Sequence, residues 1–245
     1  MCGIVGYIGK RDVAPLLLEG LARLEYRGYD SAGLVINSPK SAALKMVKAK
    51  GRVRDLEARV PKRFTGTTGI AHTRWATHGA PSDHNSHPHL DPENKVAVVH
   101  NGIVDNAQEL RAKLEADGVV FASETDTEVI THLVARSQAE TLEDKVRDAL
   151  KVIEGTYGIA VMHADFNDRI VVARNGSPVI LGIGEKEMLV ASDVAALIAH
   201  TRQVVTLDDG EMATLKADDF RTAMTTVPAA AKPIFVSIGM LTTAR

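Results

Sequence analysis

Cys2 is the only cysteine among the 245 residues, and it stands directly before the apolar run Gly3-Ile4-Val5-Gly6-Tyr7-Ile8, which predicts a buried strand. If Met1 is removed, Cys2 carries both a thiol and a free α-amine. The amine has an ordinary pKa of about 7.7 to 8.0 and the thiol about 8.5, so the amine can accept the thiol proton near neutral pH. One residue then supplies a nucleophile and its base, as an N-terminal threonine does. The alternative interpretation is a small buried hydrophobe, the usual state of a lone cysteine.

Two further stretches carry polar side chains at the ends of apolar runs. Residues 69–79 predict a strand that enters a loop carrying Arg74, Trp75, Thr77 and His78, and such a loop is typical of a binding site. A β-branched run over 95–99 ends in His100-Asn101-Gly102, which predicts a sharp Asn-Gly turn. That turn would expose a side-chain amide and a backbone N–H, the two donors an oxyanion hole requires, although an ordinary turn has the same sequence.

Asp126 lies in the segment Ser123-Glu124-Thr125-Asp126-Thr127-Glu128, ahead of a periodic apolar stretch. Thr125 and Glu128 have the spacing of a capping box, so part of this segment predicts the start of a helix. Asp126 would fall in the first turn, where its charge suits the helix dipole or pairs with a substrate ammonium. Both uses remain open at this point.

Three histidines, His84, His87 and His89, fall within six residues and suggest a metal site. The chain has no second cysteine, and it lacks the helical spacing of His and carboxylate that zinc hydrolases use. We therefore expect no metal.

The elements that must position these residues alternate between helices and short strands. We expect helices over 13–24, 105–117 and 141–153, a helix after the capping box, and a short one over 193–199. Strands are expected over 34–36, 157–163, 169–174, 179–182, 188–192, 203–207 and 211–215. Helix pairs alternating with runs of strands predict an α+β layered domain.

Composition excludes several classes of function. Lys and Arg number 29 against 31 Asp and Glu, without long blocks of one sign, so neither a nucleic-acid nor an anionic-membrane surface is indicated. We find no run of eighteen apolar residues and no signal-peptide pattern, so we expect no membrane association. A single cysteine excludes an intramolecular disulfide and suits a cytoplasmic location.

Five motifs together resemble one known family. In chain order they are Cys2-Gly3-Ile4-Val5-Gly6, Tyr26-Arg27-Gly28-Tyr29-Asp30-Ser31-Ala32-Gly33, residues 72–79 (HTRWATHG), His100-Asn101-Gly102 and Ser123-Glu124-Thr125-Asp126-Thr127-Glu128. The chain is similar over residues 2–215 to the glutaminase domain of glucosamine-6-phosphate synthases, the isomerising glutamine–fructose-6-phosphate aminotransferases. Amidotransferases of purine and asparagine synthesis share the first motif but typically lack the second and third.

The resemblance implies an N-terminal-nucleophile hydrolase fold, a four-layer αββα sandwich with two stacked antiparallel sheets. It also implies hydrolysis of the side-chain amide of L-glutamine, with ammonia passed to a sugar phosphate and no cofactor. For the reaction itself, the resemblance implies that Cys2 is the nucleophile and that the Asn101 side chain and the Gly102 N–H bind the oxyanion. For the substrate, it implies that Arg74, Thr77 and His78 bind the α-carboxylate and that Asp126 binds the α-ammonium. It also implies that Trp75 gates the passage of ammonia and that Arg27 orders the surroundings of the nucleophile.

The resemblance stops before the end of the chain. We expect a glutaminase domain over 1–215 and an atypical tail over 216–245, with the sugar-phosphate isomerase domains absent. The ammonia acceptor is then expected in those domains or in a separate enzyme, and an oligomer is compatible with the sequence. Two alternatives stay open: an N-terminal-nucleophile hydrolase for another amide, and a non-catalytic glutamine-binding subunit if Met1 is retained.

Overall fold

The computed structural model describes residues 2–38, 41–76 and 79–225. The helices of the described chain are α1 (Val13–Leu24), α2 (Val53–Arg59), α3 (Ala107–Ala116), α4 (Thr127–Arg136) and α5 (Leu142–Leu150), with 3₁₀ turns η1 (Glu25–Arg27), η2 (Ala164–Phe166) and η3 (Val194–Ala196). The strands are β1 (Gly3–Ile8), β2 (Ser31–Asn37), β3 (Lys45–Lys50), β4 (Thr68–Arg74), β5 (His89–Leu90), β6 (Val96–Val104), β7 (Gly155–His163), β8 (Ile170–Asn175), β9 (Ile180–Gly184), β10 (Glu187–Ala191), β11 (Gln203–Thr206), β12 (Glu211–Leu215) and β13 (Phe220–Met224).

These strands form two antiparallel sheets. The first has the order β11-β9-β10-β1-β4-β2-β3, and the second has the order β13-β12-β8-β7-β6-β5. The N-terminal strand β1 lies inside the first sheet, between β10 and β4. A residue placed just before β1 is therefore held by a strand that is hydrogen-bonded on both sides.

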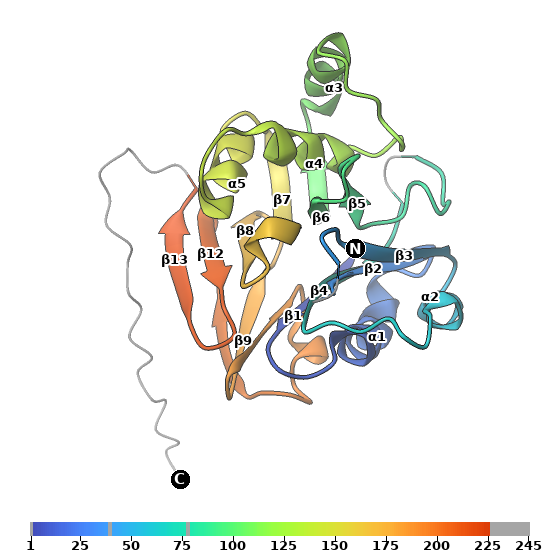
Figure 1. The fold of residues 1–245 in the computed structure, drawn as a ribbon, viewed down its shortest axis with the longest axis vertical. Coiled ribbons are helices and arrows are strands. Elements are labelled where there is room, and N and C mark those ends of the chain that lie inside the picture. The colour runs from blue at the N-terminus through green and yellow to red at the C-terminus, as the bar shows by residue number, and fades with distance from the viewer. Residues whose placement is uncertain (1, 39–40, 77–78, 226–245) are drawn as a thin grey trace.

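The two sheets stack face to face between layers of helices. Along β1, Val5 and Tyr7 belong to the core under α1 and α2, whereas Ile4 and Ile8 belong to the core between the sheets. A strand alternates its side chains between its two faces, so burial on both faces explains the continuous apolar run. Helices α4 and α5 cover the outer face of the second sheet, on the opposite side of the molecule from α1 and α2 (Figure 1). This is the four-layer αββα arrangement expected from the resemblance.

Most expected elements are present within two or three residues of their predicted ends. The helix predicted over 105–117 is α3, and Gly118, which follows it, has a φ of +85°, as a C-terminal glycine should. The helix expected over 193–199 is the shorter turn η3.

The second sheet continues beyond residue 215. Strand β13 pairs with β12 in antiparallel register and lies inside the segment 216–245, which we expected to be an atypical tail. Residues 226–245 of that segment lie outside the described residues. Within the described part of the chain, no helix has the length and apolar character needed to cross a bilayer.

Candidate functional site

Cys2 and Arg74 are brought together by the pairing of β1 with β4. The register pairs Gly3 with Thr73, so Cys2, just before β1, lies beside Arg74, the last residue of β4. The Trp75 N–H donates to Cys2 Sγ at 3.2 Å, and Sγ lies 3.5 Å from the Trp75 carbonyl oxygen. Antiparallel pairing thus places the first and third motifs at one end of the first sheet.

Asn101 and Gly102 come from the second sheet, and the predicted turn is wrong. Strand β6 runs through both residues to Val104, and Gly102 pairs with Tyr157 on β7. Gly102 has a φ of +139°, and a Cβ there would meet the Thr156 carbonyl oxygen at 2.1 Å, so only glycine fits. The Asn101 side chain reaches Cys2, because its Nδ2 donates to the Cys2 carbonyl oxygen at 3.2 Å.

Asp126 is the residue immediately before α4, and the capping-box prediction is wrong. No side chain caps this helix. Thr125 Oγ1 instead lies 2.8 Å from His89 Nε2, while the Glu128 carboxylate turns back toward the preceding loop. Asp126 is buried, and its Oδ2 accepts a hydrogen bond from the Val104 N–H at 2.9 Å. That bond fixes the carboxylate at the end of β6.

One cavity of about 320 Å³ collects these side chains. Its lining includes seven of the nine residues predicted for the site, namely Cys2, Arg27, Arg74, Trp75, Asn101, Gly102 and Asp126. Thr77 and His78, the other two, lie outside the described residues. Five motifs spread over more than a hundred residues of sequence therefore meet at one cavity, which is lined by residues of both sheets.

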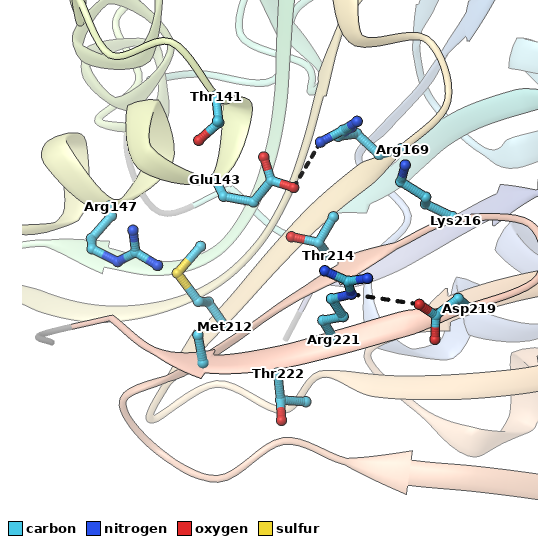
Figure 2. A pocket seen from close by; sticks show the side chains of 11 residues that line it. Thr141, Glu143, Arg147, Arg169, Met212, Thr214, Lys216, Asp219, Arg221 and Thr222 are labelled. Atoms are coloured by element: carbon cyan, nitrogen blue, oxygen red, sulfur yellow. Dashed lines mark hydrogen bonds and ion pairs between the residues drawn. The ribbon is translucent and has the colours of Figure 1, made fainter. Parts of the chain in front are cut away.

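A second cavity, of about 360 Å³, lies between α5 and the β12–β13 edge (Figure 2). Its charged side chains are mostly paired with one another: Arg169 with Glu143 at 3.0 Å, and Arg221 with Asp219 at 3.6 Å. None of the predicted site residues lines it. Its lining contains no cysteine and neither of the residues predicted to bind the oxyanion, so it is not a candidate for the predicted chemistry.

The thiol of Cys2 is less acidic than an ordinary cysteine. Burial raises the pKa of Cys2, and the hydrogen bond from the Trp75 N–H only partly offsets this. The thiol therefore keeps its proton at neutral pH, and attack on an amide requires a nearby base.

Arg74 provides a buried positive charge at the same cavity. Its side chain is only 3% exposed, and one of its guanidinium nitrogens donates to the Gly79 carbonyl oxygen at 3.1 Å. Burial lowers the pKa of Arg74, while the negative charges of Asp30 and Asp126 act in the opposite direction. An arginine stays protonated in this setting, so the cavity contains a cation and an anion that a zwitterionic ligand would match.

Arg27 holds the backbone of Cys2. Its Nε donates to the Cys2 carbonyl oxygen at 3.2 Å, and its Nη1 pairs with Asp193 Oδ2 at 2.9 Å. The Tyr26 hydroxyl donates to the same carboxylate oxygen at 2.7 Å. Asp193 was missed by sequence reasoning, because its only local signal is that of a residue starting a short helix.

Trp75 lies at the rim of the cavity, with half of its side chain exposed. Its ring meets Tyr29 edge-on, with centroids 5.6 Å apart.

Asp30, which sequence reasoning did not single out, accepts a hydrogen bond from the Ala76 N–H and so anchors the segment that follows Trp75.

Two of the three histidines that suggested a metal are part of the packing, whereas His84 is exposed. His87 and His89 are buried with ring centroids 5.0 Å apart, and burial lowers the pKa of both. Among the described residues, no group of three or more His, Cys, Asp or Glu is arranged to hold a metal ion.

Glu128 stabilises the loop that carries Asp126. Its two carboxylate oxygens accept hydrogen bonds from the Ala122 and Ser123 N–H groups, both at 2.7 Å, and from the Ser123 hydroxyl at 2.6 Å. His132 Nε2 lies 3.4 Å from the same group. Burial alone would raise the pKa of Glu128, but the bonds from His132, Ser123 and Ala122 outweigh it and hold the pKa well below 4.5.

Replacing Glu128 by glutamine should therefore destabilise the fold at neutral pH by about 1 to 3 kcal/mol, the usual cost of weakening buried charge-assisted hydrogen bonds. The folded-state pKa is depressed, so this stabilisation is full above the unfolded pKa of Glu128 and declines as the pH falls toward the folded value. Denaturant unfolding at pH 7 and pH 4 measures both quantities. If the difference in unfolding free energy between wild type and Glu128→Gln is not smaller at pH 4 than at pH 7, the assignment is contradicted.

Comparison with known proteins identifies the family of the chain. The profile of the glutamine amidotransferase domain matches residues 72–199, more than half of the sequence. The chain belongs to the glutamine amidotransferase family. It is 50% identical over 228 residues to the glutamine–fructose-6-phosphate aminotransferase (isomerizing) of Chlorobaculum tepidum, covering 90% of this chain and 37% of that protein. The Thermus thermophilus protein of the same name is 49% identical over 216 residues, covering 88% of this chain and 35% of that protein.

The fold of this amidotransferase is also that of solved relatives. The glutamine phosphoribosylpyrophosphate amidotransferase from B. subtilis matches with a TM-score of 0.80 at 26% identity, over 93% of this chain and 50% of that one. The predicted N-terminal-nucleophile sandwich is confirmed. The amidotransferase spans a little over a third of the length of the aminotransferases it matches.

Proposed function

We propose that this chain hydrolyses the side-chain amide of L-glutamine to glutamate and ammonia through a thioester on Cys2. The observation that carries the proposal is the content of one cavity: a thiol, an amide donor beside it, a buried cation and a buried anion. A glutamine molecule offers a matching carbonyl, carboxylate and ammonium.

The reaction begins with the proton of the Cys2 thiol. Once Met1 is removed, the α-amine of Cys2 takes that proton, directly or through water, and the sulfur attacks the amide carbon. Charge then develops on the former carbonyl oxygen, which the Asn101 Nδ2–H and the Gly102 N–H stabilise. The amine returns the proton to the departing nitrogen, and ammonia leaves. Water then attacks the thioester by the same route and releases glutamate.

The charged ends of the substrate fix its position. We place the α-carboxylate against Arg74, with Thr77 and His78, and the α-ammonium against Asp126. Two charged anchors hold the amide near the sulfur, which lowers the entropic part of the barrier and excludes amides without an amino-acid head. Arg27 keeps the Cys2 backbone in place while the thiol reacts.

The ammonia released from glutamine requires an acceptor. The matched relatives carry the name glutamine–fructose-6-phosphate aminotransferase (isomerizing), so we propose that ammonia passes to a sugar phosphate on isomerase domains or on a separate enzyme of amino-sugar synthesis. Trp75, half exposed at the rim of the cavity, is the residue we assign to gating that passage. We place the reaction in the cytoplasm, since the single cysteine forms no internal disulfide.

Intact mass and glutamate release, measured on the same purified protein, test the proposal. We expect the Met1-free form to release glutamate from glutamine and the Met1-retaining form not to, because an amide nitrogen at Cys2 cannot serve as the base. A preference for acyl amides lacking an α-amino acid head would favour the general amidohydrolase. Glutamine binding without turnover by the Met1-free form would favour a non-catalytic binding subunit.

A further inference from the structure

His72 is a fully buried histidine behind the oxyanion donor, and the chemistry above gives it no role. It lies on β4, and its Nε2 is 3.0 Å from Asn101 Oδ1 and 3.1 Å from the His100 carbonyl oxygen. Its ring packs against His87 with centroids 4.3 Å apart. The third motif therefore reaches the site through His72 as well as through Arg74.

The partners of His72 fix its tautomer. A backbone carbonyl oxygen only accepts hydrogen bonds, so the nitrogen facing the His100 carbonyl must carry the proton. Burial lowers the pKa of His72 to about 3, so the ring is neutral at physiological pH. With the single proton on Nε2, Nδ1 carries none, and Nδ1 is buried without a hydrogen-bond partner among the described residues.

The same reasoning fixes the direction of the Asn101 amide. Its nitrogen faces the Cys2 carbonyl oxygen at 3.2 Å, and its oxygen faces the protonated Nε2 of His72. Reversing the amide would place two oxygens together at Cys2 and two donors together at His72. In the reversed orientation, Asn101 would present its oxygen to Cys2 and could not donate to an oxyanion. The hydrogen bond from His72 to Asn101 Oδ1 disfavours this reversed orientation.

We propose that His72 is a positioning residue, which holds the Asn101 side-chain amide with its N–H groups toward the nucleophile through an Nε2–H hydrogen bond to Oδ1. The expected kinetic effects rest on the proposed glutamine hydrolysis, whereas the tautomer of His72 and its hydrogen bond to Asn101 do not depend on that function. His72 acts only through Asn101, so its removal should affect the step in which charge develops and leave substrate binding almost unchanged.

Steady-state glutaminase kinetics of His72→Leu, with His72→Met as a second apolar variant, test this role. We expect kcat to fall about 10- to 100-fold, less than the roughly 10²- to 10³-fold cost of deleting an oxyanion donor outright, with KM within about threefold of wild type. His72→Gln, whose terminal amide can donate to Oδ1, should recover most of the activity. His163→Leu, the same change at the last residue of β7, which pairs with Val96 at the far end of β6 from Asn101, should keep wild-type kinetics.

Two readouts separate positioning from general support of the fold. Alkylation of Cys2 by iodoacetamide develops no oxyanion, so its rate should be unchanged in the His72 variants. In a double-mutant cycle, His72→Leu should add nothing to Asn101→Ala, because the residue it orients is already gone. Additive losses, or an equal fall in alkylation and turnover, would overturn the proposal.

The tautomer can be read without any activity. The imidazole ¹⁵N spectrum of the wild-type protein at pH 7 should show His72 protonated at Nε2 and unprotonated at Nδ1. An Nδ1–H tautomer would overturn the positioning role even in a fully active enzyme. Absence of glutamine turnover in wild type together with the Nε2–H tautomer would instead count against the proposed function alone.

Discussion

Replacing Cys2 by alanine is expected to reduce glutamate release from glutamine by about 10⁴- to 10⁶-fold, the range seen when a covalent nucleophile is removed. No other thiol exists in the chain to substitute for it. Binding of glutamine should persist, because the charged anchors are untouched. Glutamate release measures the first effect, and isothermal titration with glutamine measures the second.

Cys2→Ser supplies the matched control for this change. A serine hydroxyl occupies nearly the same space, but its pKa lies far above that of a thiol, so turnover should again be very low while folding is preserved. A diazoketone or chloroketone analogue of glutamine should add its mass to wild-type Cys2 and to neither variant. If the alanine variant still releases glutamate at a tenth of the wild-type rate, Cys2 is not the nucleophile.

The sequence alone predicts most of this site because its motifs are local. Cys2 is singled out by its position, and the run after it predicts the strand that holds it. Arg74 follows a predicted strand, and antiparallel pairing of two such strands places the start of one beside the end of the other. The apolar run of β1 places this strand between two packed layers, because it has apolar residues on both faces, whereas the four-layer order was implied by the family resemblance.

The parts that sequence reasoning missed depend on partners distant in the chain. The Asn101-Gly102 turn was wrong because β7 pairs with this segment and extends β6 through it. The capping box failed because the backbone amides of the preceding loop take the Glu128 carboxylate. Asp193 is 166 residues from Arg27, and no local signal marks such a contact. His72 carries a motif signal, but its function becomes visible only with its acceptors in place.

We propose that the specificity of the site for glutamine depends on Asp126, and Asp126→Asn tests this role without changing the shape of the site. Asparagine keeps an oxygen that can accept from the Val104 N–H, as Asp126 Oδ2 does at 2.9 Å. It loses the negative charge that we assign to the α-ammonium of glutamine. Removing one partner of a buried charge pair costs about 2 to 4 kcal/mol, so kcat/KM for glutamine should fall roughly 30- to 1,000-fold.

The loss should be confined to substrates that carry the ammonium. For 4-carbamoylbutanoic acid, which is glutamine without its α-amino group, wild-type kcat/KM should already be low, because Asp126 is then buried without a cation. The Asn variant should use this compound at least as well as wild type does, so the preference for glutamine should collapse. Asp105→Asn, an exposed change just beyond β6, should leave the preference intact. A variant that loses both substrates equally would show that Asp126 supports the loop rather than the ammonium. Selectivity for glutamine would then have to come from Arg74, through its binding of the α-carboxylate, and not from Asp126.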